Sequence, residues 1–224
     1  MFRRLILIIL LLLNGLCFAY TKQDDEYSCG VFSCYNLIEK SCVKCKNYEP
    51  EELRVLLKTD KNGTTAQNLC DGLKQYFNSQ NKIADVRYYG IKKVSNYKID
   101  NNIDLLKLKT LIDNGYYAIL NIGVYRKDKN FYNRVYGHYV NLISIKKNKL
   151  QIFDPYDKNK KFINWNFQTT NAQINNINDN EEYENISEYI KINTPISYLE
   201  KNEIALVNGV ILVKYFDINV TGDN

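Results

Sequence analysis

Apolar residues recur at helical spacing in two stretches of the chain. Between Thr64 and Phe77 the apolar positions are three and four residues apart, at Ala66, Leu69, Cys70, Leu73, Tyr76 and Phe77. That spacing places the side chains on one face of a helix, whose start is indicated by Asn62-Gly63-Thr64. A second helix is predicted over residues 103–112, with Asn114-Gly115 as its C-cap.

Runs of β-branched and aromatic residues then predict strands. Three of them follow one another at residues 117–125, 138–145 and 149–153, and a fourth covers 204–215. Lys147-Asn148 separates the second run from the third as a tight turn. Consecutive antiparallel strands are therefore expected.

The remaining segments of the chain carry weaker patterns. Residues 87–91 and 93–97 are read as short extended pieces, whereas the chain after Asp154-Pro155 is polar through about residue 184. We expect a long loop there, with one short helix near Trp165 and Phe167. Two helices followed by a mostly antiparallel sheet predict an α+β fold.

The first residues resemble a secretory signal peptide. Arg3 and Arg4 precede an apolar run over residues 5–13, and small or neutral residues then lead to a cleavage site between Ala19 and Tyr20. An uncleaved membrane anchor is the alternative, but the run is shorter than the roughly 20 residues that a spanning helix needs. We therefore predict a secreted protein with no stable membrane span after cleavage.

Composition narrows the class of partner. Loss of residues 1–19 removes two arginines and lowers the formal net charge from +5 to +3, and the remaining charges of both signs are scattered. Such a chain shows no nucleic-acid footprint, so an unidentified peptide or protein is the expected ligand. About 205 residues suffice for one core, which we assign to residues 51–218, after a cysteine-rich segment at 20–50 and before a tail at 219–224.

Four cysteines crowd into the first mature segment, at Cys29, Cys34, Cys42 and Cys45. In an exported chain they predict a disulfide-rich segment with two bridges, although three pairings are open. A zinc site is the alternative because Cys42 and Cys45 form a C-x-x-C pair, but the other pair is spaced differently. No metal or cofactor is expected, since the chain has one histidine and no clustered carboxylates.

That one histidine carries the candidate chemistry. His138 opens a predicted strand, and Asp154 closes the neighbouring strand of the same hairpin. Residues at these ends of paired strands lie close together, so the carboxylate is able to orient the imidazole and stabilise its charged form. The alternative is a purely structural role, in which the hydrogen bonds of the histidine are satisfied and Asp154-Pro155 is simply a turn.

The surrounding motifs resemble papain-like cysteine peptidases of the bacteriocin-processing type. The resemblance runs from about Lys61 to Phe167, and its best parts are LLKLKTLIDNGYYAILNIG, GHYVNLISI and IFDPYDKNKKFINW. It implies a papain-like α+β domain in which His138 is the general base and Asp154 orients it. The family's helix begins with a cysteine, whereas this chain has Asn62 at the matching position, and EELRVLLKTDK lacks the family's oxyanion-hole glutamine.

Other thiols are candidate nucleophiles. Cys70 lies within the predicted helix, on the face where a cysteine most often packs as a small hydrophobe. A rearranged loop is the other route, and it would bring Cys29 or Cys45 to His138. A sulfur within hydrogen-bond reach of His138 would decide for an active enzyme.

Three functions therefore remain open. The leading hypothesis is a catalytically inactive pseudopeptidase that binds peptides, because the thiol and the glutamine are missing at the matching positions. The second is an active cysteine peptidase or acyl-transfer hydrolase that uses Cys70 or another unconventional thiol. The third is an interaction protein that acts through residues 20–50. Asn62 is also one of three Asn-x-Ser/Thr sequons, with Asn185 and Asn219, and a glycan there would block the cleft.

Overall fold

The computed structural model describes residues 20–218 except 43–44, 47, 130, 158–161, 173 and 176–187. The predicted signal peptide, the tail and two of the sequons, Asn185 and Asn219, lie outside these residues. The described helices are α2 (Cys29–Ser41), α3 (Pro50–Leu56), α4 (Ala66–Ser79) and α5 (Leu105–Asp113). The described strands are β1 (Lys82–Gly90), β2 (Lys98–Asp100), β3 (Tyr117–Asp128), β4 (Phe131–Lys146), β5 (Lys149–Phe153), β6 (Phe162–Thr170), β7 (Ile174–Asn175), β8 (Tyr189–Ile192) and β9 (Glu203–Asp217).

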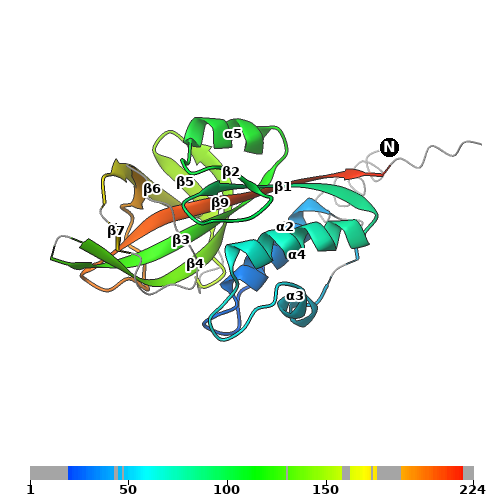
Figure 1. The fold of residues 1–224 in the computed structure, drawn as a ribbon, viewed down its shortest axis with the longest axis horizontal. Helices are drawn as coiled ribbons and strands as arrows, with labels where there is room; N and C mark the ends of the chain where they lie inside the picture. The colour runs from blue at the N-terminus through cyan, green and yellow to red at the C-terminus, as the bar shows by residue number, and fades with distance from the viewer. Residues whose placement is uncertain are drawn as a thin grey trace, which may run out of the picture.

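Six of the strands close into an antiparallel barrel. They follow the order β9-β3-β4-β5-β6-β8, and β8 pairs with β9 as well as with β6. β1 pairs over its whole length with residues 209–217 of β9, on the edge opposite β3 and beyond the β8 pairing, and β2 adds to β1 in parallel. In Figure 1, β9 crosses the molecule as the long orange-to-red strand that links the barrel to the β1 ribbon.

This architecture corrects the predicted fold class. The chain is mostly sheet around a closed barrel, and it is no clear α+β papain-like arrangement of N-terminal helices and a sheet. The prediction failed because closure depends on β6 and β8, and β6 runs through the segment around Trp165 that was read as loop and short helix. Trp165 is buried opposite Leu150 of β5, so the polar residues of β6 alternate with core residues.

The predicted disulfide-rich segment is also different in the structure. Its sequence forms α2, whose apolar face is buried in one core with α4 and with the sheet residues Ile119, Tyr139 and Ile211. Phe32, Leu37 and other apolar side chains of α2 are buried against the main sheet, because their own segment offers too few apolar contacts to bury them. α2 is therefore an integral part of the core.

The helices cover different sides of the sheet. α2 and α4 pack together on one face, while α5 contributes Leu108 to a second core that fills the barrel. Figure 1 shows α5 on the opposite side of the sheet from α2, α3 and α4. The predictions of helices at 64–77 and 103–112, and of strands at 117–125, 149–153 and 204–215, are confirmed with small shifts of boundary. The strand predicted at 138–145 is present but begins at Phe131, so His138 lies inside β4 and does not open it.

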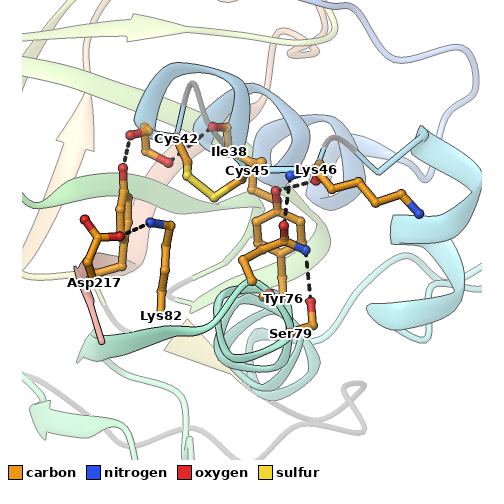
Figure 2. Close-up of a disulfide and its surroundings, with 11 residues drawn as sticks. Ile38, Cys42, Cys45, Lys46, Tyr76, Ser79, Lys82 and Asp217 are labelled. Atoms are coloured by element: carbon orange, nitrogen blue, oxygen red, sulfur yellow. Dashed lines mark hydrogen bonds and ion pairs between the residues drawn. A yellow bond between two sulfur atoms is a disulfide. The ribbon is translucent and has the colours of Figure 1, made fainter. Parts of the chain in front are cut away.

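One disulfide is present where two were predicted. Cys42 and Cys45 are bonded at the end of α2, whereas Cys29 and Cys34 are free thiols. Figure 2 shows that this turn rests on α4, where the Tyr76 hydroxyl donates to the Lys46 carbonyl at 2.8 Å. Among the described residues, no helix is long and apolar enough to cross a membrane.

Candidate active site

The strand hairpin brings the predicted histidine and aspartate together. His138 of β4 places Nε2 2.7 Å from Oδ1 of Asp154, which directly follows β5. Both side chains are buried, with exposed fractions of 6% and 2%. Because Asp154 occupies Nε2, Nδ1 is the ring nitrogen left for another partner.

Further hydrogen bonds fix the carboxylate of Asp154. The backbone N–H of Tyr156 donates to Oδ1 at 2.9 Å, and the Tyr198 hydroxyl donates to Oδ2 at 3.2 Å. Burial by itself would raise the pKa of Asp154, but the charge of His138 and these hydrogen bonds lower it below its ordinary value. The carboxylate therefore stays ionised beside the imidazole.

Cys29 is the third member of this cluster. Burial by itself would lower the pKa of His138, but Asp154 and then a side-chain hydrogen bond and charge interaction with Cys29 raise it. Cys29 is the first residue of α2 and lines the same cavity as His138. The structure thus brings together a thiol, an imidazole and a carboxylate from three separate elements.

Local packing determines where the start of α2 lies. The Ser33 hydroxyl donates to the Tyr139 carbonyl at 3.0 Å, and Asn141 Nδ2 donates to the Ser33 carbonyl at 2.8 Å. These bonds fasten α2 to β4 one helical turn beyond Cys29. Gly30 allows the loop before α4 to approach, because a Cβ there would lie 2.8 Å from Thr64 Oγ1. The thiol is therefore held at a defined place beside β4.

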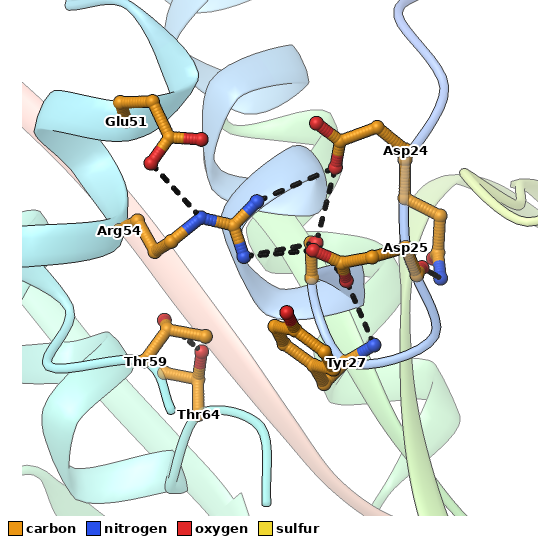
Figure 3. A network of polar contacts seen from close by, with 9 residues as sticks. Asp24, Asp25, Tyr27, Glu51, Arg54, Thr59 and Thr64 are labelled. Carbon is orange, nitrogen blue, oxygen red and sulfur yellow. Dashed lines mark hydrogen bonds and ion pairs between the residues drawn. The ribbon is translucent and has the colours of Figure 1, made fainter. Parts of the chain in front are cut away.

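A polar network shapes the loop that precedes Cys29. Arg54 of α3 forms ion pairs with Asp24 at 3.3 Å and Asp25 at 3.0 Å, and it donates to Ser28 at 3.1 Å (Figure 3). Asp25 also accepts from the Tyr27 backbone N–H at 2.9 Å. The loop between residues 23 and 29 is thus tied to α3 at Asp24, Asp25 and Ser28.

Gln23 lies at the other end of that loop, six residues before Cys29. Its backbone N–H donates to the Pro155 carbonyl at 3.1 Å, next to Asp154. Its side-chain Nε2 donates to the Asp25 carbonyl at 2.6 Å, which leaves the second N–H of the amide for another acceptor. Gln23 and Cys29 line the same cavity.

The cavity has a volume of about 870 Å³ and lies between the start of α2, the loop before α4 and β4. Its walls are mainly polar or aromatic and carry charges of both signs. The residues that line it include Gln23, Glu26, Tyr27, Cys29, Lys58, Asp60, Asn62, Thr64, Lys92, Asn121, Arg134, Gly137, His138, Tyr139, Tyr156 and Tyr198. A space of this size accommodates several residues of an extended peptide.

The other predicted site residues lie apart from this cluster. Asn62 is exposed at the cavity rim, in the turn before α4, where its backbone N–H donates to Asp60 Oδ1. Cys70 is fully buried within α4, and burial raises the pKa of its thiol well above the ordinary value. Cys34 is equally buried in α2, and Cys45 is in the disulfide. Of the cysteines, only Cys29 lines the described cavity.

The sequence interpretation missed Gln23, and it offered Cys29 only as an alternative thiol that a rearranged loop would bring to His138. The signal was a glutamine six residues before Cys29-Gly30, followed by apolar residues at helical spacing at Val31, Cys34 and Ile38. The cluster of four cysteines concealed it, because an exported chain favours disulfides. No group of three or more metal-ligating side chains occurs among the residues that the structure describes.

Comparison with solved structures shows a distant structural likeness. No family model and no curated protein matches the chain. The crystal structure of the peptidase domain of Streptococcus ComA, a bi-functional ABC transporter involved in a quorum sensing pathway, is similar at 23% sequence identity and a TM-score of 0.44. The match covers 65% of this chain and 84% of that domain. A likeness this distant assigns no function, so the site is interpreted from its own residues.

Proposed function

We propose that this protein is an active cysteine peptidase, or a related acyl-transfer hydrolase, with Cys29 as nucleophile. His138 is its general base and Asp154 orients the imidazole. The observation that carries the proposal is that Cys29, at the start of α2, lines the same cavity as His138, whose Nε2 is held by Asp154 at 2.7 Å. A nucleophile beside a base that a third group orients is the arrangement needed for nucleophilic catalysis.

The reaction follows from these positions. His138 takes the proton of the Cys29 thiol, and the thiolate attacks the carbonyl carbon of a bound peptide. The charge on the carbonyl oxygen is stabilised by the backbone N–H of Cys29, which has no acceptor within the first turn of α2, and by the free N–H of Gln23. His138 then protonates the leaving amine, and water releases the acyl group from the sulfur by the reverse steps.

The other hypotheses have less support. The hypothesis of an inactive pseudopeptidase was based on the absence of a thiol at Asn62, and Cys29 supplies a thiol from a different helix. Cys70 has neither access to the cavity nor contact with His138 that would support it as nucleophile. The interaction hypothesis relied on a separate cysteine-rich segment, but most of α2 is buried in the core.

Alkylation of the purified protein tests the proposal. Iodoacetamide is added to the folded chain, and the modified cysteine is identified by peptide mapping. We expect rapid alkylation at Cys29 near neutral pH, loss of this labelling in Cys29→Ser, and a large decrease in its rate in His138→Ala. Cys70→Ser is the matched control and keeps the labelling. Alkylation of Cys29 at the same rate in His138→Ala would contradict the proposed pair.

Export by the N-terminal segment is part of the same proposal. Residues 1–19 carry the charged start, the apolar run and the small residues of a signal peptide. Amino-terminal sequencing of the protein from its natural host is expected to begin at Tyr20. A mature chain that begins at Met1 would contradict it.

A further inference from the structure

Two opposed strand residues of the cavity lining each carry a buried polar atom without a hydrogen-bond partner. Asn121 of β3 and Tyr139 of β4 lie directly opposite each other in the antiparallel ladder. Their exposed fractions are 1% and 4%, and both line the cavity that contains Cys29. Among the described residues, neither Oδ1 of Asn121 nor the hydroxyl of Tyr139 has a hydrogen-bond partner.

Such groups are uncommon because a buried polar atom without a hydrogen bond destabilises the fold. Other polar side chains of this region are bonded through at least one atom: the Tyr125 hydroxyl donates to Asn208 Oδ1 at 2.8 Å, and Gln23 Nε2 donates to the Asp25 carbonyl, although Gln23 Oε1 is itself unpartnered. Asn121 and Tyr139 differ in that their unpartnered atoms belong to residues directly opposite one another in the cavity lining, which points to a ligand that supplies the missing bonds.

The two atoms offer complementary hydrogen-bonding roles. Burial raises the pKa of Tyr139 well above its ordinary value, so its hydroxyl stays protonated and is able to donate. Oδ1 of Asn121 is an acceptor. A ligand that satisfies both must therefore present a donor and an acceptor close together, as a carboxamide or a hydroxyl group does.

Their position relates them to the reacting bond. Tyr139 and Asn121 lie opposite each other on β4 and β3, Tyr139 belongs to the core shared with α2, and its ring lies against the backbone beside Cys29, since a Cβ on Gly30 would be 3.4 Å from Tyr139 Cδ2. A side chain that reaches Asn121 and Tyr139 therefore belongs to a residue near the scissile bond.

We propose that Asn121 and Tyr139 form a specificity subsite for an uncharged polar side chain, a carboxamide or a hydroxyl, on a substrate residue that flanks the scissile bond. The inference rests on the proposed peptidase function. The carbonyl oxygen of a glutamine or asparagine accepts from Tyr139, and its N–H donates to Asn121. An aliphatic side chain leaves both groups unpaired, and sites built to hydrogen-bond a substrate discriminate strongly against such analogues.

Matched peptide substrates test the subsite. Fluorogenic peptides are varied at the residues on either side of the scissile bond, with glutamine compared with methionine, glutamate and lysine. At one of these positions we expect kcat/KM for the glutamine peptide to exceed that for the methionine peptide by about 10² or more. Equal rates for the two, or a preference for glutamate or lysine, would overturn the inference.

Two variants locate the effect. Asn121→Leu and Tyr139→Phe are each expected to lower the glutamine-to-methionine ratio by about tenfold. Tyr125→Phe is the control, because its buried hydroxyl lies outside the cavity lining; it leaves the ratio unchanged. An unchanged ratio in both subsite variants would refute the assignment, and the ratio of the parent protein tests the proposal even where a variant fails to fold. Alkylation of Cys29 by iodoacetamide is measured in parallel, since its absence would instead refute the peptidase function.

Discussion

Replacing Asp154 by asparagine removes the charge of the carboxylate while keeping the shape of the side chain. The amide oxygen is able to accept from His138 and from the Tyr156 backbone N–H, as Oδ1 of the carboxylate does. The Tyr198 hydroxyl, which now donates to Oδ2, is able to accept from the amide nitrogen instead. Asp154→Asn therefore isolates the electrostatic role of Asp154, whereas Asp154→Ala also removes the hydrogen bonds.

The magnitudes of the two variants differ for this reason. Asp154→Ala leaves the buried His138 without its partner, which costs about 3–5 kcal/mol of folding stability. Asp154→Asn weakens one charge-assisted hydrogen bond, worth about 1.5–3 kcal/mol. For catalysis, we expect kcat/KM to fall by no more than about tenfold in Asp154→Asn, since a Cys-His-Asn arrangement is functional. In Asp154→Ala we expect it to fall by about 10²–10⁴.

The effect of Asp154→Asn on folding stability should depend on pH in a direction that the two pKa shifts determine. The pKa of His138 is raised in the folded protein, so its contribution is fully present below 6.5, the ordinary value, and declines as pH rises. The pKa of Asp154 is lowered, so its contribution is present above 3.8 and is lost as pH falls. The stability difference between the parent and Asp154→Asn should therefore be largest between about pH 4 and 6.5.

Two measurements check this reasoning. Guanidinium unfolding at about pH 5.5 and 9.5 should show a smaller difference between parent and Asp154→Asn at the higher pH. The alkaline limb of kcat/KM against pH should move to lower pH in Asp154→Asn, because the imidazolium that protonates the leaving amine loses its counter-charge. A limb at the same pH in both proteins, or equal losses for asparagine and alanine, would refute the electrostatic role assigned to Asp154.

Three further changes have expected outcomes. Arg54→Met should lower the free energy of unfolding by about 1 kcal/mol. Because the loop from Gln23 to Cys29 loses its anchor, kcat should fall more than KM changes, and hydrogen exchange in that loop should become faster. Tyr139→Phe should be neutral or stabilising by about 1 kcal/mol in urea unfolding, since it removes an unpartnered hydroxyl, whereas Tyr125→Phe should destabilise by a similar amount. Gly30→Ala should destabilise by about 1–3 kcal/mol in the same assay, because its Cβ would lie 2.8 Å from Thr64 Oγ1.

The sequence predicts those parts of the site that depend on neighbouring strands. His138 and Asp154 are 16 residues apart, and one hairpin brings them together, so period-two patterns and a turn were enough to place them. The barrel was not predictable in this way. Its closure requires β8 to pair with β9, and a four-residue strand beside a polar segment gives little sequence signal.

From the sequence, Cys29, the proposed nucleophile, was only a secondary candidate, because its position depends on contacts between distant parts of the chain. Ser33 of α2 bonds to the backbone of Tyr139, which is 106 residues later, and it is this docking that places Cys29 beside His138. No periodicity within α2 indicates which strand the helix will contact, so a cysteine in a cysteine-rich segment is interpreted first as half of a disulfide.

The fold determines which cysteines form a disulfide and which stay free thiols. Cys42 and Cys45 share one turn and pair with each other, whereas Cys29 is held one helix away by Ser33 and Asn141 and stays a free thiol. The same bonds that bury α2 in the core therefore also keep Cys29 available for His138.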